Sequence, residues 1–409
     1  MGKRKGNGEG SITKRADGRY MARFTVDGKR KTVYGLSFEE VRQKLTEKLN
    51  DLSKGVYMEF GKDTIESWLY EWLVTYALPT VKQSTYISYE GYVRNHIVPE
   101  MGKEKLSTLN KDRLQRFFNK KKTGTKTKKG LSPKTLKNIY NMLNSVLDGA
   151  VESKKLLYNP IKGVRLPPIE KKEMKVLDPL QQLELQNAAI ASEELSAFGI
   201  IFALSTGVRV GELCGFRWTD LNQFTRYIHV YRTVGRLNKV DEDGNVMKKS
   251  NDGNSTEIVV RTPKSQAARR DIPLFDELWD GLMDYKKRVR SWFESHGLDF
   301  DEEGYIFCNP FGQVYDPRVY DDLYKRTLKA AGLEKINFHA LRHTFATRAL
   351  EAGMDIKVLS SLLGHAQPST TLNLYAHALP DHKRASMKKM SGYYTSSSKT
   401  NLLSEKKAG

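Results

Sequence analysis

The segment Ser205-Thr-Gly-Val-Arg209-Val-Gly-Glu212-Leu213 joins two helical stretches and decides how the C-terminal half of the chain folds. A Thr-Gly turn leads into the second helix, so Arg209 is expected in the first turn, where free N–H groups and the positive end of the helix dipole lie. Arginine is disfavoured at that end of a helix, because its charge opposes the dipole. The segment therefore predicts an oxyanion or phosphate site at Arg209, with Glu212 placed three residues on to hold the guanidinium.

Helices and short strands alternate around this segment. Asp178-Pro179 begins the helical part as an N-cap followed by proline, and helices are expected to continue to about Arg217. Strands are predicted at 227–234, 257–262 and 270–274, before helices that the strand-like stretch 305–308 interrupts. The polar stretch 235–255, with its Asp-Gly turns, is expected to form an elongated hairpin tip. These elements predict an α+β domain over residues 175–394, followed by a flexible tail, 395–409.

Residues 59–168 have the periodicity of an all-helical domain. Apolar residues recur at three- and four-residue steps after Asp63, and the Asp63/Glu66 spacing predicts a capping box at the first helix. Three more helices are predicted, over Ser84–Ile97, Lys111–Lys120 and Ser132–Val151. The Pro- and Lys-rich stretch that ends at Lys175 predicts a linker into the following domain.

Residues 1–58 predict a small β-sheet packed on one helix. Aromatic and β-branched residues alternate with charged ones from Ser11 to Val33 around an Asp-Gly turn, which is typical of a hairpin. Ser37 then begins a helix, with Glu40 at the capping-box spacing and an apolar stripe behind it. Excess basic charge favours nucleic-acid binding over an inert solvated module, through Arg19, Arg23, Lys29, Arg30 and Lys31.

The charge of the whole chain points to a polyanionic partner. The 409 residues include 68 Lys+Arg and 48 Asp+Glu, a formal net charge of +20. Residues 1–35, 111–137 and 381–409 carry +7, +10 and +5, which leaves −2 for all the others. The densest run, 120–130, contains no apolar residue. It fits either a solvated loop or a surface that follows phosphates, through Lys120, Lys121, Lys122, Lys126, Lys128 and Lys129.

Several classes of protein are disfavoured by composition. Two cysteines, Cys214 and Cys308, are too few for a disulfide framework, which favours a reducing intracellular compartment. The longest apolar run, Ala197–Leu204, is too short to span a membrane. No hydrophobic region follows the first charged residues, so no secretory signal is expected. Disorder of the whole chain does not fit 39% hydrophobic residues and 31 glycines.

A second motif is His339-Ala-Leu-Arg342-His343, which predicts a helix with His339 and Arg342 on one face. The opposite face carries Leu341, Phe345 and Ala349. His339 and His343 also stand four residues apart, as zinc ligands do on a helix. The glutamate that follows the first histidine in metalloprotease helices is missing, and no carboxylate follows within a turn, so no metal site is predicted.

Two other positions are unremarkable on their own. Lys264 is expected at the tip of a hairpin, where a lysine is ordinary surface. Tyr375 follows Leu-Gly-His365 in a Thr-Thr-x-x-x-Tyr context, but any one of 20 tyrosines is more often a core residue than a nucleophile. Their order along the chain changes the interpretation.

The ordered set Arg209, Lys264, His339-x-x-Arg342, Leu-Gly-His365 and Tyr375 closely resembles the tyrosine recombinases, and among them the integrases of temperate phages and conjugative transposons. The resemblance implies an arm-site DNA-binding domain over 1–58, a helical, SAM-like core-binding domain over 59–168 and a catalytic domain over 175–394. It also implies double-stranded DNA with core and arm attachment sites as the partner, and a homotetramer in the synapse. An excisionase and a host DNA-bending protein are further expected partners, in the cytoplasm of a bacterium and on its nucleoid.

The residue types suit such chemistry. A phenol with a pKa of about 10 lies roughly 4 kcal/mol from its phenolate at neutral pH, so a tyrosine nucleophile needs help. Arg209 and Arg342 are expected to bind the non-bridging oxygens of a DNA phosphodiester, which needs no metal, other cofactor or ATP. His339 is expected to accept the phenol proton and His365 to donate a hydrogen bond to the phosphate. Lys264 is expected to protonate the departing 5′-hydroxyl, and the product is a 3′-phosphotyrosyl link.

Two alternatives remain open at this stage. A type IB topoisomerase shares the Arg, Lys, Arg, His, Tyr set, but it has little need for the separate N-terminal module. A non-enzymatic, sequence-specific DNA-binding regulator explains the basic surfaces and leaves the six ordered residues to accident.

Overall fold

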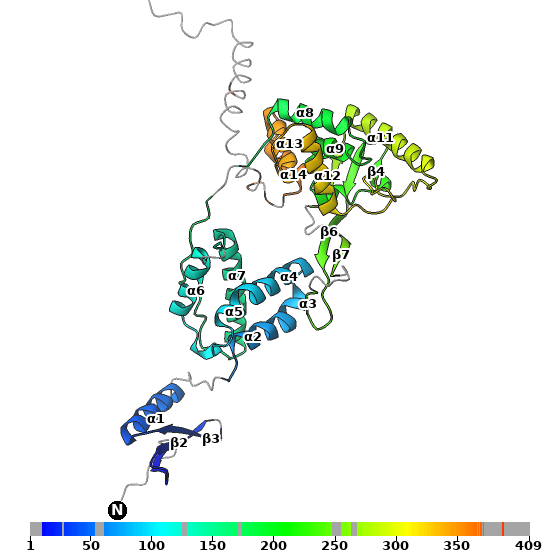
Figure 1. The fold of residues 1–409 in the computed structure, drawn as a ribbon. Coiled ribbons are helices and arrows are strands. Elements are labelled where there is room, and N and C mark those ends of the chain that lie inside the picture. Colours follow the sequence, from blue (N-terminus) through cyan, green and yellow to red (C-terminus); the bar gives the residue numbers. More distant parts are fainter. Residues whose placement is uncertain are drawn as a thin grey trace, which may run out of the picture. The chain divides into compact units, whose positions relative to one another are not determined.

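The computed structural model describes residues 10–26, 28–53, 61–124, 129–170, 174–247, 255–262 and 268–365, together with Gln367, Ser369, Thr371 and Met387. The chain divides into two compact units (Figure 1). The first unit is Met1–Glu170 with Val240–Val246, and the second is Lys171–Lys239 with Met247–Gly409. None of the described helices has the length and apolar character that crossing a lipid bilayer requires.

The N-terminal part of the first unit is a three-stranded antiparallel sheet with one helix. The strands are β1 (Ser11–Lys14), β2 (Tyr20–Val26) and β3 (Lys29–Gly35), with β2 in the middle, and the helix is α1 (Phe38–Ser53). Ala22 and Phe24 of β2 pack against Val41 and Leu45 of α1. The predicted sheet on one helix is confirmed, and β1 adds a third strand to the predicted hairpin.

The start of α1 differs slightly from the predicted capping box. The Ser37 hydroxyl accepts a hydrogen bond from the Glu40 N–H at 3.1 Å, as expected. The Glu40 carboxylate accepts from the Leu36 N–H at 2.8 Å, one residue before the position that a capping box uses. The first bond satisfies an N–H group in the first turn of the helix, which has no internal acceptor, and the second satisfies the N–H of the residue before the cap.

The rest of the first unit is helical. Its elements are α2 (Ile65–Trp72), η1 (Leu73–Ala77), α3 (Leu78–Thr80), α4 (Gln83–Tyr92), η2 (Val93–Ile97), α5 (Val98–Met101), η3 (Leu106–Thr108), α6 (Lys111–Thr123) and α7 (Pro133–Glu152). The predicted helices are confirmed. The predicted Asp63/Glu66 capping box is wrong, because Thr64 caps α2 and exchanges hydrogen bonds with Ser67. Asp63 instead forms an ion pair with Lys155 at 3.3 Å.

Two π-helical turns, η1 and η2, interrupt the helices of this module for the same reason. Each is followed two residues later by a proline, Pro79 or Pro99. A proline ring clashes with the carbonyl four residues earlier, and here that carbonyl belongs to the π turn, at Thr75 or Asn95. In both turns the chain widens so that Leu78 and Val98 donate to the carbonyl five residues back.

The segment Val240–Val246 is part of the first unit although it lies between β6 and β7 of the second in the sequence. Val240 and Val246 pack on the helical core. The buried Tyr86 hydroxyl donates to the Gly244 carbonyl at 2.7 Å. This segment is the central part of the polar stretch 235–255, whose residues 248–254 lie outside the described part of the chain.

The second unit combines helices with two small antiparallel sheets. The sheets have the strand orders β4-β5-β8 and β6-β7. Its elements are α8 (Pro179–Ile190), α9 (Phe198–Thr206), α10 (Val210–Leu213), η4 (Trp218–Asp220), β4 (Leu221–Asn222), β5 (Tyr227–Val230), β6 (Thr233–Asn238), β7 (Thr256–Arg261), β8 (Arg270–Pro273), α11 (Asp276–Ser295), α12 (Pro317–Ala330), α13 (His339–Glu351) and α14 (Ile356–Leu363). Asp178 caps α8 as predicted, with Gln181 as its partner. The fold class, helical with small sheets and an α+β second unit, is confirmed.

Three strand predictions need correction. The predicted strand 227–234 is two strands, β5 and β6, in different sheets; the break lies at Arg232, whose guanidinium pairs with the buried Asp220 at 2.6 Å. The strands that flank Lys264 do not form a hairpin, because β7 pairs with β6 and β8 pairs with β5. The stretch 305–308 forms only isolated bridges, at Tyr305 and Cys308.

Candidate active site

The turn between α9 and α10 places the first candidate residue. Helix α9 ends at Gly207, whose φ of +66° is left-handed, and a Cβ there would lie 2.4 Å from Cδ1 of Phe345. Glycine is therefore required on two counts. Arg209 follows as the N-cap of α10, not in its first turn as predicted, and α10 is a single turn of four residues. The site depends on the Arg209 side chain more than on a helix dipole.

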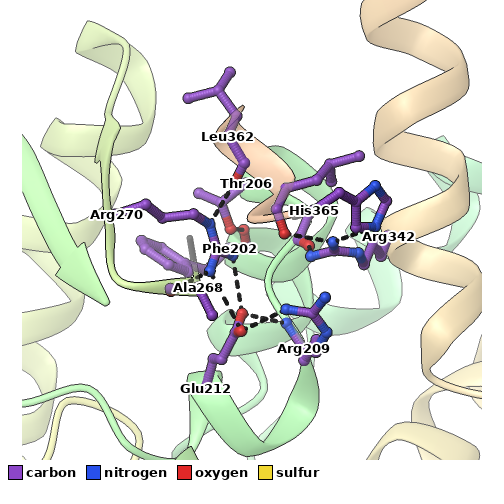
Figure 2. Close-up of polar contacts among 11 residues, drawn as sticks. Phe202, Thr206, Arg209, Glu212, Ala268, Arg270, Arg342, Leu362 and His365 are labelled. Atoms are coloured by element: carbon purple, nitrogen blue, oxygen red, sulfur yellow. Dashed lines mark hydrogen bonds and ion pairs between the residues drawn. The ribbon is translucent and has the colours of Figure 1, made fainter. Parts of the chain in front are cut away.

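Glu212 lies between two arginines (Figure 2). Arg209 donates to it from Nη1 at 2.7 Å and from its backbone N–H at 3.1 Å, so the predicted contact is present. Arg270 donates from Nη2 at 2.9 Å and from Nη1 at 3.3 Å. Burial by itself would raise the pKa of Glu212, but the charge of Arg270, and after it that of Arg209, lowers the pKa to about 2. The carboxylate is ionised at neutral pH.

Helix α13 buries Arg342, of which only 2% is exposed. Its Nη1 donates to the carbonyl of Gly207 at 2.9 Å, and its Nη2 donates to the carbonyl of Leu363 and to Nε2 of His365, the latter at 2.9 Å. The guanidinium thus joins the turn before Arg209 to the end of α14. By contrast, 38% of the Arg209 side chain is exposed.

His365 follows Gly364, the left-handed residue that ends α14. Since a guanidinium only donates, Nε2 of His365 accepts from Arg342, and Nδ1 carries the proton shared with the Thr371 hydroxyl at 2.8 Å. Burial and the nearby Arg342 lower the pKa of His365 to about 4, so this neutral form is the one expected at pH 7. In this state His365 does not offer Nε2 as the predicted donor to a phosphate.

His339 is the first residue of α13, and its ring meets that of His343 edge to face, with 4.6 Å between centroids. Partial desolvation and the charge of Arg342 lower the pKa of His339. Burial and the neighbouring His339 lower the pKa of His343 to about 4. Within the described part of the chain, no three His, Cys, Asp or Glu side chains gather in a way that could hold a metal ion.

The structure brings four of the predicted residues together, Arg209, Glu212, Arg342 and His365 (Figure 2). His339 is the first residue of the helix that carries Arg342. Lys264 and Tyr375 lie outside the described residues. Two contributors were missed, Arg270 and Thr371. The available indication for Arg270 was its alternation with Ile272 and Leu274, which are buried and place it on the inward face of β8.

The basic residues of the N-terminal sheet divide between its two faces. Phe24 lies opposite Lys31 in the β2–β3 register, so Lys31, and two residues before it Lys29, belong to the face that packs on α1. Arg23 and Arg30 belong to the other face and are exposed. Arg19 precedes β2 and pairs with Asp17 at 3.2 Å. The outer face therefore carries Arg23 and Arg30.

The predicted lysine run begins in the last turn of α6. Lys120 and Lys121 lie 2.8 and 3.8 Å from the Glu100 carboxylate, whereas the side chains of Lys122 and Lys129 are exposed. A pocket of about 580 Å³ opens beside this turn, lined by Glu100, Lys120, Lys121, Lys129, Asn95 and His96 among others. Lys126 and Lys128 are outside the described residues.

Two family models match the chain. The model for the phage integrase family covers residues 175–382, and the model for the SAM-like N-terminal domain of phage integrases covers residues 64–122. A tyrosine recombinase XerC-like protein of Caldanaerobacter subterraneus subsp. tengcongensis is 31% identical over 87% of this chain and 89% of its own. The ICEBs1 integrase of Bacillus subtilis is 26% identical over 62% of this chain and 64% of its own.

Solved structures share the fold. The Tn1549 transposon integrase in complex with transposon right end DNA aligns with a TM-score of 0.61 and 24% identity, covering 80% of this chain and 99% of that one. A lambda integrase tetramer bound to a Holliday junction aligns with a TM-score of 0.55 and 18% identity, over 87% of this chain and 96% of that one.

Proposed function

Since the chain belongs to the phage integrase family and is a tyrosine recombinase, we propose that Tyr375 cuts and rejoins DNA at specific sites to integrate and excise a mobile element. The observation that carries the proposal is the cluster in which Arg209, Glu212, Arg342 and His365 meet. Three of these residues belong to the ordered set, and Glu212 is the supporting residue expected beside Arg209. The type IB topoisomerase and the non-enzymatic regulator have no such support from the family match.

The proposed reaction conserves the phosphodiester. The Tyr375 oxygen attacks phosphorus, and its proton passes to His339. The bond to the 5′-oxygen breaks, and this oxygen takes a proton from Lys264, which leaves a 3′-phosphotyrosyl link and a free 5′-hydroxyl. Attack by a 5′-hydroxyl of another duplex reverses these steps and completes strand exchange. Because the number of phosphoester bonds is unchanged, no ATP is needed.

The two arginines are proposed to bind the non-bridging oxygens of that phosphodiester. Arg209 is partly exposed, so a phosphate can reach it, and Glu212 fixes one edge of its guanidinium. Arg342 donates hydrogen bonds to two backbone carbonyls, and its Nη2 also donates to Nε2 of His365. Fixed donors aimed at developing negative charge are the strongest single source of stabilisation in such sites.

The two histidines are proposed to have different roles. His339, with its lowered pKa, is neutral at pH 7 and able to accept the phenol proton. His365 is neutral and accepts from Arg342 in the described state. An incoming phosphate brings negative charge that raises the pKa of His365, so that Nε2 becomes a donor to the phosphate and frees Nη2 of Arg342 for the same oxygen.

The domains are proposed to share the DNA between them. Residues 1–58 bind arm sites through Arg23 and Arg30, residues 59–168 hold core DNA through the lysines at the end of α6, and 175–394 carry out catalysis, with 395–409 as a tail. Structural relatives bound to DNA support DNA as the partner, and one of them is a tetramer on a Holliday junction. An excisionase, a host DNA-bending protein and a place on the nucleoid of a bacterial cell complete the proposal.

The test uses purified full-length chain and a supercoiled plasmid that carries two copies of the junction sequence formed when the element encoding the chain closes into a circle. Recombinant circles are expected in buffer with EDTA and without ATP. Relaxation without any exchange would favour the topoisomerase, and a strict requirement for a divalent metal would overturn the metal-free mechanism. Arg209→Ala is the paired variant, with a loss of roughly 100-fold or more expected from removal of a fixed charge-stabilising group.

A further inference from the structure

Arg270, the first residue of β8, is buried behind the candidate site. Only 5% of its side chain is exposed. Nη2 and Nη1 donate to the two oxygens of Glu212, Nη1 donates to the Ala268 carbonyl at 3.1 Å, and Nε donates to the Leu362 carbonyl (Figure 2). Burying a guanidinium destabilises the fold unless its N–H groups are hydrogen-bonded and its charge is paired, so these contacts fix Arg270 in one orientation.

The contacts form a chain that ends at Arg209. Glu212 has Arg270 on one side and Arg209 on the other, and each oxygen of its carboxylate serves both arginines. The carboxylate cannot turn toward Arg270 or away from it without disturbing the Arg209 bond. The buried guanidinium of Arg270 thus sets the position of the partly exposed guanidinium of Arg209 through Glu212.

A second contact reaches the other half of the cluster. Leu362, whose carbonyl binds Arg270, precedes Leu363, whose carbonyl binds Arg342, and His365 follows two residues later. Arg270 therefore connects α10, which Arg209 caps, with the end of α14. Arg209 lies at the start of α10, and the Arg342–His365 pair lies at the end of α14, so Arg270 contacts both groups of proposed phosphate ligands through their supports.

We propose that Arg270 is a positioning residue for phosphoryl transfer: it fixes Glu212 and the last turn of α14, and thereby aligns Arg209 and the Arg342–His365 pair with the scissile phosphate. The inference rests on the proposed function. It differs from a merely structural role, in which Arg270 only stabilises the fold and its loss affects every substrate alike.

The test compares two substrates in single-turnover cleavage. Both are nicked duplexes of the junction sequence; one has a normal scissile phosphodiester, and the other has a methylphosphonate there, which carries no negative charge on its non-bridging oxygen. Arg270→Lys keeps the charge and loses the fork of donors. On the phosphodiester we expect its cleavage rate to fall by roughly 100-fold, the scale of a small misplacement of a catalytic group, with DNA affinity unchanged. On the methylphosphonate we expect a loss at least tenfold smaller.

A matched control is available in the same unit. Arg232 pairs with the buried Asp220 at 2.6 Å and contacts none of the cluster residues in its described bonds. Arg232→Lys weakens a comparable buried ion pair. If weakening such a pair were enough to slow cleavage, this variant would also be slow. We expect it instead to cleave both substrates at the wild-type rate. Thermal unfolding of each variant confirms that the protein is folded at the assay temperature.

The outcomes separate the two proposals. If the wild-type chain cleaves neither duplex, the proposed function fails. If the wild type cleaves and Arg270→Lys retains its rate, or loses the same factor on both substrates, the positioning role is overturned. A loss confined to the charged phosphodiester supports it.

Discussion

Gly207 shows how narrowly one backbone position at the site is defined. Its left-handed φ ends α9, its carbonyl accepts from Arg342, and its missing Cβ leaves room for Phe345. We expect Gly207→Ala to lower the free energy of unfolding by about 2–4 kcal/mol, from backbone strain and overpacking together. Urea unfolding measures this loss.

Gly297 supplies the control for that substitution. It has a similar φ of +67°, and no atom lies within 4 Å of the position of a Cβ. Gly297→Ala should cost only the strain, about 1–2 kcal/mol. Equal losses in the two variants would show that the contact with Phe345 is not what requires glycine at position 207.

At this scale the sequence predicts contacts between near neighbours and misses distant ones. Arg209 and Glu212 are three residues apart, so their ion pair follows from local geometry. Arg270 is 58 residues from Glu212, and nothing in its own segment identifies what lies on its inward side. The same limit applies to Arg342, which the motif places at the site but whose bonds to Gly207 and Leu363 come from packing.

Among the secondary-structure elements, helix existence was predictable and helix details were not. Apolar periodicity predicts α6 and α7 well, because both have one buried face. The Thr64 cap competes with an equally suitable Asp63 one residue earlier, and composition cannot choose between them. Strand pairing is predicted in part: β6 and β7 pair on either side of the hairpin expected at 235–255, but β8, the next strand along the chain, pairs with the more distant β5 and not with β7.

The register of β2 and β3 makes a prediction about DNA binding. Arg23 and Arg30 lie on the face away from α1, and Lys31 lies on the face that packs on it. We expect Arg23→Ala with Arg30→Ala to weaken binding of a labelled DNA duplex and to reduce its salt slope by about 1 for each phosphate that the variant no longer binds. Fluorescence anisotropy over a salt series measures both quantities.

Lys31→Ala is the comparison for that experiment, because it removes a positive charge from the same strand. A smaller change in slope is expected for it, since its side chain starts from the helix-facing side of the sheet. If Lys31→Ala changed the slope as much as an outer-face arginine does, DNA would not be bound by the outer face.

Over the whole molecule, charge and chemistry occupy different parts of the chain. The net charge of +20 comes from three segments, 1–35, 111–137 and 381–409, and the remaining residues sum to −2. The described cluster lies outside all three, and its cations are individually fixed by Glu212 or by backbone carbonyls. In the proposed function, general attraction to DNA and phosphoryl transfer thus depend on different residues.

The sequence predicts only part of the division of the chain into two units. Helical periodicity, the linker before Lys175 and the strand pattern indicate separate modules in order. They do not predict that Val240–Val246, from the middle of a hairpin, packs with the helical module through Tyr86. Such a contact depends on shape and on one buried hydroxyl, neither of which leaves a periodic pattern in the sequence.

The central claim is that Tyr375 is the nucleophile. Its most direct test is to trap the chain on a nicked duplex of the junction sequence, digest the complex and identify the residue that carries the nucleotide by mass spectrometry. We expect a nucleotide on Tyr375, no adduct with Tyr375→Phe although the duplex is still bound, and a normal adduct with the control Tyr394→Phe. A covalent adduct that persists in Tyr375→Phe, or a nucleotide found on another residue, would contradict the claim.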